Sequence, residues 1–338
     1  MKEKKFADKS KTALPPIDRD SVYTEATLPF LLILVCLAIT LIATVIERFI
    51  YPFGKELLSP IILQIVAILL PCYLVLLIIS PDRAAGAHRR SINFGKLHVE
   101  YVFFMIFSAM FMMCASLILS MLFGGTYSAA EGYVLLGVFT AGQNEYTASI
   151  PYLLIAYVLL PAISEELLFR GIIYTQLKKI NAPLAVAVSS VLSAAFCFSI
   201  GGFIHALFSA LVLVFVLYTT GSLAACVIVH LIFNLYKLFL ETNVSAYFLS
   251  AQNVALLILT VVIAFLISSI LFFSECAKIY RARATVAAQE HQKHKPIKTT
   301  LHKLWLDVRL MLSFRPTLVC AIISLVIYVA ILTIGLLT

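Results

Sequence analysis

The residues of this chain that could do chemistry lie in two apolar segments. One segment contains Glu165, Glu166 and Arg170, and the other contains His230 and Asn234. Side chains four residues apart share one face of an α-helix, so Glu166 and Arg170 can form an ion pair. By the same spacing His230 and Asn234 point the same way, where they could bind a metal or a water, or donate to an oxyanion. Glu165 has no local partner in its apolar segment, which suits a general base.

Each part of this set also has a structural interpretation. The Glu166–Arg170 pair can be a bridge within one helix, and the histidine and the asparagine can form hydrogen bonds between helices. His205 lies between the two segments and is expected to be a buried polar group. Glu165 is harder to explain in this way, because a second carboxylate has no structural necessity. Taken together, the set favours a functional site.

The composition places this set in a membrane protein. Of the 338 residues, 62% are apolar and 12% are charged, and the mean hydropathy is +1.02. A soluble protein would expose much of that apolar surface to water, so disordered, disulfide-rich, coiled-coil and soluble-enzyme classes are poor matches. The motifs HExxH, GxSxG and GxGxxG and the Walker A loop are absent, which disfavours the usual helical zinc proteases, serine hydrolases and nucleotide-driven transporters.

The lengths of the apolar segments predict an all-α fold, a polytopic transmembrane helical bundle with about nine spans. Lys and Arg are concentrated in alternate loops, which places the N-terminus in the cytoplasm. The same topology explains the net charge of +8, so we expect no nucleic-acid partner. Lys237 lies near the outer end of the seventh segment, where a long side chain can reach the membrane interface. The expected spans are approximately 27–47, 57–80, 99–123, 149–177, 183–200, 203–219, 222–240, 246–273 and 317–337.

The same pattern divides the chain into regions. The fifth and sixth spans are short and are separated by Gly201 and Gly202, so we expect either a tight helical hairpin or a partly re-entrant pair. The regions are a cytoplasmic tail at 1–26, two N-terminal transmembrane helices with a basic loop at 27–97, a core with the candidate residues at 98–240, a further transmembrane helix at 241–273, a basic cytoplasmic loop at 274–316 and a C-terminal transmembrane helix at 317–338.

These motifs resemble the CPBP family of intramembrane proteases, which is also described as the CAAX-protease and bacteriocin-processing or Abi family. The family's EExxxR motif is matched by Glu165, Glu166 and Arg170. Its later motif, a histidine followed four residues on by Asn or Asp, is matched by His230 and Asn234, and it follows the family-like sequence TGSL at 220–223. The resemblance covers approximately residues 98–240 and implies that this region is a catalytic helical core.

This chain departs from one motif of the family. The family has FxxxH near the end of the span that follows EExxxR, and residues 193–202 contain no histidine. The spacing places the expected histidine near Cys197. Either Cys197 replaces it, since a thiolate can bind zinc, or His205 reaches the site by an altered path past Gly201, or the site is degenerate.

The resemblance implies an intramembrane endopeptidase that acts near the cytoplasmic leaflet. Glu165 would activate the water that attacks a peptide bond, and Glu166 with Arg170 would hold the helix and tune that carboxylate. His230 and Asn234 would bind a metal or stabilise the oxyanion; if zinc is the cofactor, His230 and Glu165 are its candidate ligands. The expected partners are the lipid bilayer and a peptide or membrane-tethered protein substrate, either a prenylated CAAX protein or a bacterial-type peptide.

Two other functions stay open at this point. The missing histidine suggests a catalytically degenerate family member that acts as a membrane binding or bacteriocin-immunity protein. A transporter with an ionisable pathway would be expected to show paired half-sites or an inverted repeat, and neither is evident in the sequence. In each case we expect a multi-pass integral membrane protein, and the resemblance points to a bacterial cell membrane.

Overall fold

The computed structural model describes residues 19–50, 60–79, 95, 97–123, 150–198, 200–238, 254–289 and 301–336. All regular structure in these residues is helical, which confirms the all-α prediction. The tail up to residue 18 and the loops at 80–94 and 124–149 lie mostly or wholly outside this description. The prediction that the N-terminus is cytoplasmic depends on the charges of those segments, and it therefore stays a prediction.

Each of the nine expected spans corresponds to a helix or to an unbroken run of helical segments. Seven are long and apolar enough to cross a membrane, and two shorter ones, α9 and α11, have 14 residues each. The elements are α1 (Arg19–Ile50), α2 (Pro60–Gln64), η2 (Ile65–Leu69), α3 (Leu70–Ile79), η3 (Val99–Tyr101), α4 (Val102–Phe123), α6 (Ile150–Leu153), η5 (Leu154–Leu159), α7 (Leu160–Glu166), η6 (Leu167–Tyr174), α8 (Thr175–Lys178), α9 (Ala182–Ala195), α10 (Ile200–Thr220), α11 (Leu223–Tyr236), α13 (Val254–Gln289), α14 (Leu301–Ser313) and α15 (Arg315–Leu336). The chain is therefore an integral membrane protein by its helices as well as by its composition.

The break between the fifth and sixth spans lies earlier than the sequence suggested. Gly201 and Gly202 are inside the first turn of α10, so their assignment as the separator was wrong. The helix breaks after Ala195 instead, where Phe198 has a φ of +46°. α9 and α10 pack directly against each other, as in the helical-hairpin alternative.

The segment 274–316, expected to be a basic loop, is largely helical. α13 continues to Gln289, through a stretch rich in alanine and arginine, both strong helix formers. α14 is amphipathic: its Leu304, Val308 and Leu312 pack against the protein core, whereas Trp305 is exposed. Both stretches were taken for loop because neither is apolar enough to cross a membrane.

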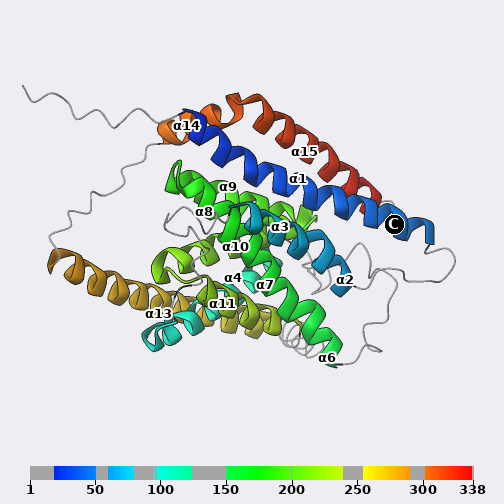
Figure 1. Cartoon of the computed structure of the whole chain (residues 1–338). Helices are drawn as coiled ribbons and strands as arrows, with labels where there is room; N and C mark the ends of the chain where they lie inside the picture. The colour runs from blue at the N-terminus through cyan, green and yellow to red at the C-terminus, as the bar shows by residue number, and fades with distance from the viewer. Residues whose placement is uncertain are drawn as a thin grey trace, which may run out of the picture.

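The helices are arranged around a central group of α7, α9, α10 and α11 (Figure 1). α1 and α15 lie side by side on one flank, and α4 and α13 lie on the opposite flank. One hydrophobic cluster joins α1, α3, η6 and α9, and a second joins α4, α10, α11 and α13. The central helices therefore lie between two apolar clusters.

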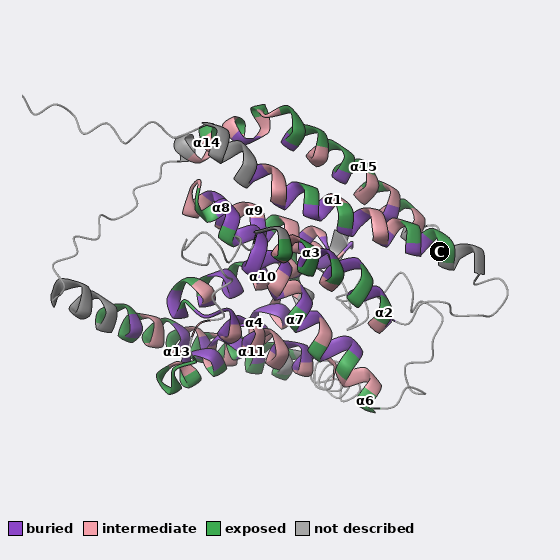
Figure 2. Ribbon diagram, viewed as in Figure 1, coloured by how far each residue is buried: buried purple, intermediate pink, exposed green. Residues whose placement is uncertain are grey.

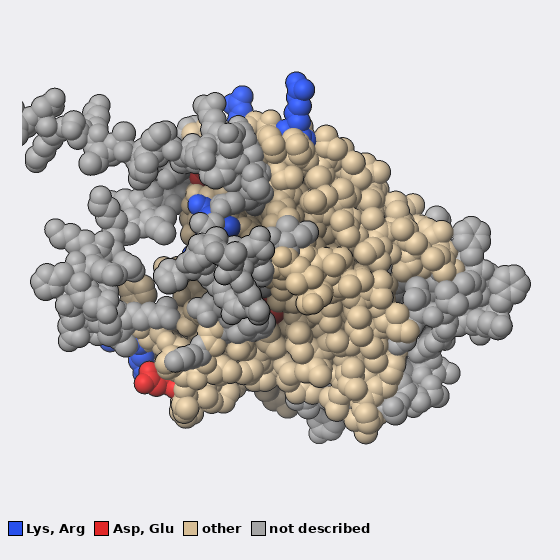
Figure 3. Space-filling view, viewed as in Figure 1, with Lys and Arg blue, Asp and Glu red and all other residues tan. Residues whose placement is uncertain are grey.

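Two of the outer spans are much more exposed than the rest. α13 and α15 are only 17% buried over their most apolar windows, whereas the other five long spans are 39–50% buried. Figure 2 shows this contrast between α15 and the central helices. On the face shown in Figure 3, charged side chains lie toward the left and upper edges, and most of the remaining described surface carries no charge. A broad uncharged surface is what a lipid-facing bundle requires.

Gly95 contacts the turn that connects α10 to α11. Its φ is +68°, and a Cβ added there would lie 2.6 Å from the Ser222 Cα and 2.9 Å from the Gly221 carbonyl oxygen. Since backbone atoms at that distance cannot yield as a flexible side chain would, only glycine fits at this position. The contact brings the segment before α4 against the start of the helix that carries His230.

We expect Gly95→Ala to destabilise the protein by about 1–3 kcal/mol, because the new Cβ adds a clash to an unfavourable φ. The measurement is the thermal unfolding midpoint in detergent. Leu97→Ala, at an exposed neighbouring position, is the control and should leave the midpoint nearly unchanged. Equal midpoints for the wild-type protein and Gly95→Ala would show that this contact does not constrain the turn.

Candidate active site

The two glutamates lie where an α-helix changes to a π-helix. Glu165 and Glu166 end α7, and Arg170 lies in the π-helix η6 that follows directly. Pro161 lies in the first turn of α7 and cannot donate a backbone hydrogen bond, and the π-helix η5 ends just before α7. π-helical turns occur frequently at functional sites because they alter the direction of side chains along a helix.

The TGSL sequence sets the start of the second helix of the site. α10 ends at Thr220, and Gly221 has a φ of +68° and donates its amide to the Leu217 carbonyl at 2.8 Å, a usual helix stop. Ser222 then caps α11, because its hydroxyl accepts the Ala225 amide at 3.3 Å. This stop and cap fix where α11 begins, and with it the direction of His230.

Arg170 joins three helical elements through buried contacts. Its Nη1 donates to Glu166 Oε1 at 3.0 Å and to Ser193 Oγ at 3.3 Å, and its Nη2 donates to the Ala210 carbonyl at 3.0 Å. Arg170 is 1% exposed and Glu166 is fully buried. The expected i,i+4 ion pair is therefore present, and it also ties η6 to α9 and α10.

Glu166 also holds the imidazole of His230. His230 Nδ1 lies 2.8 Å from Glu166 Oε1, the same oxygen that accepts from Arg170. This contact joins residues 64 positions apart, so the i,i+4 spacing that predicted the ion pair gave no signal for it. It turns the other ring nitrogen, Nε2, away from Glu166.

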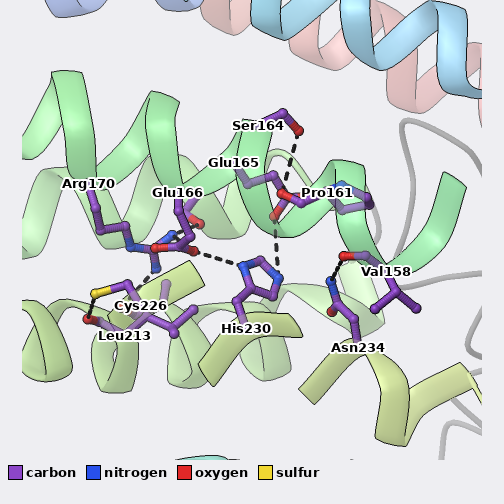
Figure 4. Close-up of polar contacts among 12 residues, drawn as sticks. Val158, Pro161, Ser164, Glu165, Glu166, Arg170, Leu213, Cys226, His230 and Asn234 are labelled. Atoms are coloured by element: carbon purple, nitrogen blue, oxygen red, sulfur yellow. Dashed lines mark hydrogen bonds and ion pairs between the residues drawn. The ribbon is translucent and has the colours of Figure 1, made fainter. Parts of the chain in front are cut away.

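His230 Nε2 faces the second glutamate. It lies 3.9 Å from Glu165 Oε2, and Figure 4 shows the imidazole between the two carboxylates. Glu165 is 30% exposed and His230 is 12% exposed, in contrast to the fully buried Glu166. The two adjacent glutamates therefore differ: Glu166 binds arginine and histidine, and Glu165 is the more accessible.

Asn234 is fixed one turn further along α11. Its Nδ2 lies 3.5 Å from the Val158 carbonyl of η5, and the residue is 2% exposed. Figure 4 shows Asn234 and His230 on the same side of α11, as their spacing predicted.

A partly open cavity of about 60 Å³ lies between these helices. That volume is enough for a few water molecules. The structure brings Glu165, His230 and Asn234 together on its wall, while Glu166 lies behind it. The cavity is lined by Glu165, Arg170, Ser193, Cys197, Ala206, Ser209, Ala210, Leu213, His230, Phe233, Asn234 and Lys237.

The two residues considered in place of the family's histidine lie differently. Cys197 lines the cavity, two residues after the end of α9, where the motif spacing placed it. His205 is buried on α10, and it is the next residue, Ala206, that contributes to the wall. Of the two, Cys197 is therefore the one placed to contact a bound molecule.

Lys237 is a cavity residue that the sequence did not identify. We expected its side chain to reach the membrane interface, and this was wrong: Lys237 is 5% exposed and lines the cavity with Asn234. The signal was available in its spacing, since Lys237 follows Asn234 by three residues and His230 by seven, which places all three on one helix face.

The donor set does not fit a catalytic zinc site. Catalytic zinc usually has three protein ligands from His, Cys, Asp or Glu side chains. In the described part of the chain, no three such side chains are grouped closely enough to hold a metal ion. Glu165 and His230, the candidate ligands, face each other as a pair, and we therefore derive no step through a metal.

Comparison with protein families supports the resemblance inferred from the motifs. Residues 147–236 match the family model described as type II CAAX prenyl endopeptidase Rce1-like. The matched residues run over α6 to α11, the helices that carry the candidate residues, and the match supports a likeness to intramembrane proteases of the CAAX type over this segment. Comparison of the chain with curated proteins and with solved structures gave no match.

We expect Arg170→Met to destabilise the protein by about 3–5 kcal/mol, because it leaves Glu166 as an uncompensated buried charge. The thermal unfolding midpoint in detergent measures this loss. Arg309→Met, at an exposed position of α14, is the matched control and should change stability by less than about 0.5 kcal/mol. If both variants unfold at the same temperature, the buried ion pair does not organise the central helices.

Proposed function

We propose that this protein is an intramembrane endopeptidase in which Glu165 and His230 activate a water molecule. The observation that carries the proposal is the 3.9 Å separation of Glu165 Oε2 and His230 Nε2 on the wall of a cavity within the Rce1-like segment. That distance is too long for a hydrogen bond between the two atoms and short enough for one water to contact both.

The tautomer of His230 follows from its partner. An ionised carboxylate only accepts hydrogen bonds, and Glu166 already accepts one from Arg170. Nδ1 of His230 therefore donates to Glu166, and a neutral imidazole presents the lone pair of Nε2 to the cavity. Both Nε2 and Glu165 then act as acceptors, and a water that donates one hydrogen to each has an oxygen lone pair left for attack.

The reaction needs no group beyond the peptide, the water and these side chains. As the water oxygen bonds to the carbonyl carbon, Glu165 takes the water proton and the carbonyl electrons move to oxygen. Asn234 lines the cavity, and the second N–H of its amide is the neutral donor we assign to that oxyanion. When the tetrahedral intermediate collapses, the C–N bond breaks and Glu165 returns the proton to the leaving amine.

This proposal selects one of the roles that the sequence left open for His230. Binding of a metal, binding of a water and stabilisation of the oxyanion were all considered, and the hydrogen bond of His230 to Glu166 favours holding the water. Glu165 is the sixteenth of the 29 residues of the Ile150–Lys178 span, near its middle. The position of Glu165 along the helix therefore does not support cleavage close to the cytoplasmic leaflet.

The substrate we propose is a peptide or a membrane-tethered protein segment that enters from the bilayer. The support is the apolar surroundings of the cavity, with one hydrophobic cluster behind η6 and another behind α11. Prenylated CAAX proteins and bacterial-type peptides both stay candidates, as does a bacterial cell membrane as the location.

One observation favours a second candidate, a catalytically degenerate protein that binds a peptide without cleaving it. Cys197 borders the cavity where the family motif has histidine, and a thiol is a weaker hydrogen-bonding group than an imidazole. In this alternative the cavity and the Arg170 network are retained, and the chain acts as a membrane binding or immunity protein.

The variant Glu165→Gln directly tests the proposed role of Glu165 as the base. It keeps the shape of the side chain and removes the base, so we expect cleavage to fall at least 100-fold, with an unfolding midpoint close to that of the wild type. Cleavage is measured in detergent with quenched fluorescent peptides, prenylated CAAX-type and unlipidated.

The control is Glu275→Gln, which removes a glutamate carboxylate outside the cavity that pairs with Lys278; it should cleave as the wild type does. If wild type and Glu165→Gln show equal turnover, or if neither cleaves any peptide in the panel, the endopeptidase proposal is wrong and the binding function is favoured.

Removal of metal gives an independent test. Because the cavity lacks a third ligand for zinc in the described residues, prolonged dialysis against a chelator should change the rate of cleavage by less than about twofold; the loss of a water-activating metal would remove several kcal/mol of transition-state stabilisation. Loss of activity that is restored by added zinc would contradict the metal-free mechanism.

A further inference from the structure

α14 is an amphipathic helix that the proposed reaction does not use. Its Leu304, Val308 and Met311 belong to or pack against the hydrophobic cluster that includes η6 and α9. Trp305 and Leu306, in contrast, are 65% and 46% exposed. With 13 residues, α14 is too short to cross a membrane. The question is what the exposed side of this helix contacts.

The ends of two spans show at which level α14 lies. Thr27 in the Ala26–Ile46 span and Thr317 in the Arg315–Ile334 span lie 2.9 Å apart, oxygen to oxygen. Both spans therefore begin at the same level of the bundle. α14 directly precedes the second of them, and Figure 1 shows it beside the start of α1. This position places α14 at the membrane surface from which both spans start.

A third span ends at the same surface. Asn181 comes three residues after the end of the Ile150–Lys178 span, and its Nδ2 donates a hydrogen bond to Asp307 Oδ2 of α14. Asp307 is the only acidic residue of α14, and this bond engages one of its two oxygens. Three span ends thus surround α14, which holds the helix at the surface.

The exposed side chains around α14 fit an anionic lipid surface. Arg309 of α14 and Arg315 at the start of α15 are exposed, as are Lys178 and Lys179 at the end of the third span. Lysine and arginine side chains stand out at the upper edge of Figure 3, the side on which Figure 1 places α14 and α15. Trp305 precedes Arg309 by four residues, so the two lie on one side of the helix. Tryptophan favours the headgroup level of a bilayer, and surface cations attract anionic headgroups.

We propose that α14 is an interfacial helix that binds the headgroups of anionic phospholipids. Arg309 and Arg315 contact the phosphates, and the Trp305 ring lies at the boundary between headgroups and acyl chains. The ligand class is a phospholipid with net negative charge, such as phosphatidylglycerol. This inference does not depend on the proposed function, because α14 lies outside the Rce1-like segment and none of its residues lines the cavity.

The competing interpretation is that a second copy of the chain covers Trp305. A protein contact would shield the indole from every lipid, whereas a contact with lipid brings it within reach of the acyl chains. Trp305 is the only tryptophan of the chain. Tryptophan fluorescence of the full-length protein therefore reports on α14 alone and separates the two interpretations.

The experiment measures quenching of this fluorescence by bromine atoms on the lipid. The full-length protein is reconstituted into nanodiscs that contain phosphatidylcholine and phosphatidylglycerol in equal amounts. The acyl chains of phosphatidylglycerol are brominated in one preparation, and those of phosphatidylcholine in the other. Because both preparations have the same headgroup composition, the ratio of the two quenching efficiencies measures the preference of α14 for the anionic lipid.

We expect brominated phosphatidylglycerol to quench Trp305 at least about twofold more than brominated phosphatidylcholine. The double variant Arg309→Gln/Arg315→Gln should lower this ratio to about one, because it removes the cations beside the indole. The matched control, Lys278→Gln/Arg281→Gln, removes two exposed cations from α13 on the opposite flank and should keep the ratio. The three proteins should unfold at similar temperatures, since all four substituted side chains are exposed.

Each other outcome overturns the inference. Equal quenching by the two lipids shows that headgroup charge does not matter at α14. Absence of quenching by either lipid shows that Trp305 lies out of reach of the acyl chains and favours the second copy. A preference that persists in Arg309→Gln/Arg315→Gln does not come from these cations. A preference that is lost equally in the control variant comes from the overall charge of the protein.

Discussion

The structure depends on one buried arrangement of charge, in which a single oxygen of Glu166 accepts from both Arg170 and His230. Two ionised groups buried among apolar helices are costly unless they are paired and hydrogen-bonded. These contacts also hold the central helices together, because the residues that make them belong to η6, α9, α10 and α11. Removing any of these helices would leave a hydrogen-bonding atom of Arg170, Glu166 or His230 without one of its partners. The same contacts that satisfy Arg170 therefore position the imidazole of His230.

The two adjacent glutamates show how environment divides identical side chains between two roles. Glu166 is fully buried and bound to a cation and a histidine, so its charge is already used within the protein. Glu165, one residue earlier, is 30% exposed on the cavity wall and lies 3.9 Å from the same histidine. Two glutamates in sequence on a helix must point in different directions. One turn at the end of α7 therefore carries both a buried carboxylate and an accessible one.

Sequence reasoning succeeded where the cause is local and failed where it is tertiary. Apolar length predicted the helices, and the i,i+4 spacing predicted the contact of Arg170 with Glu166. The contact of Glu166 with His230 depends on how α7 packs against α11, and no spacing within one helix encodes it. Gly201 was taken for a helix break because glycine is a poor helix former, but the chain breaks just before it, where Phe198 has a positive φ. Lys237 was assigned to the interface by its place near a segment end, and packing buried it instead.

The departure from the family motif is best understood through what the cavity retains. Cys197 lines the cavity at the place where the motif spacing puts the family's histidine. In the proposed mechanism, the Glu165–His230 pair supplies an acceptor on each side of the water without a further imidazole, because Nδ1 of His230 is held by Glu166. The wall also carries Lys237, one turn beyond Asn234. Under the proposed mechanism this cavity needs no further imidazole, because the two acceptors that hold the water are already present on Glu165 and His230.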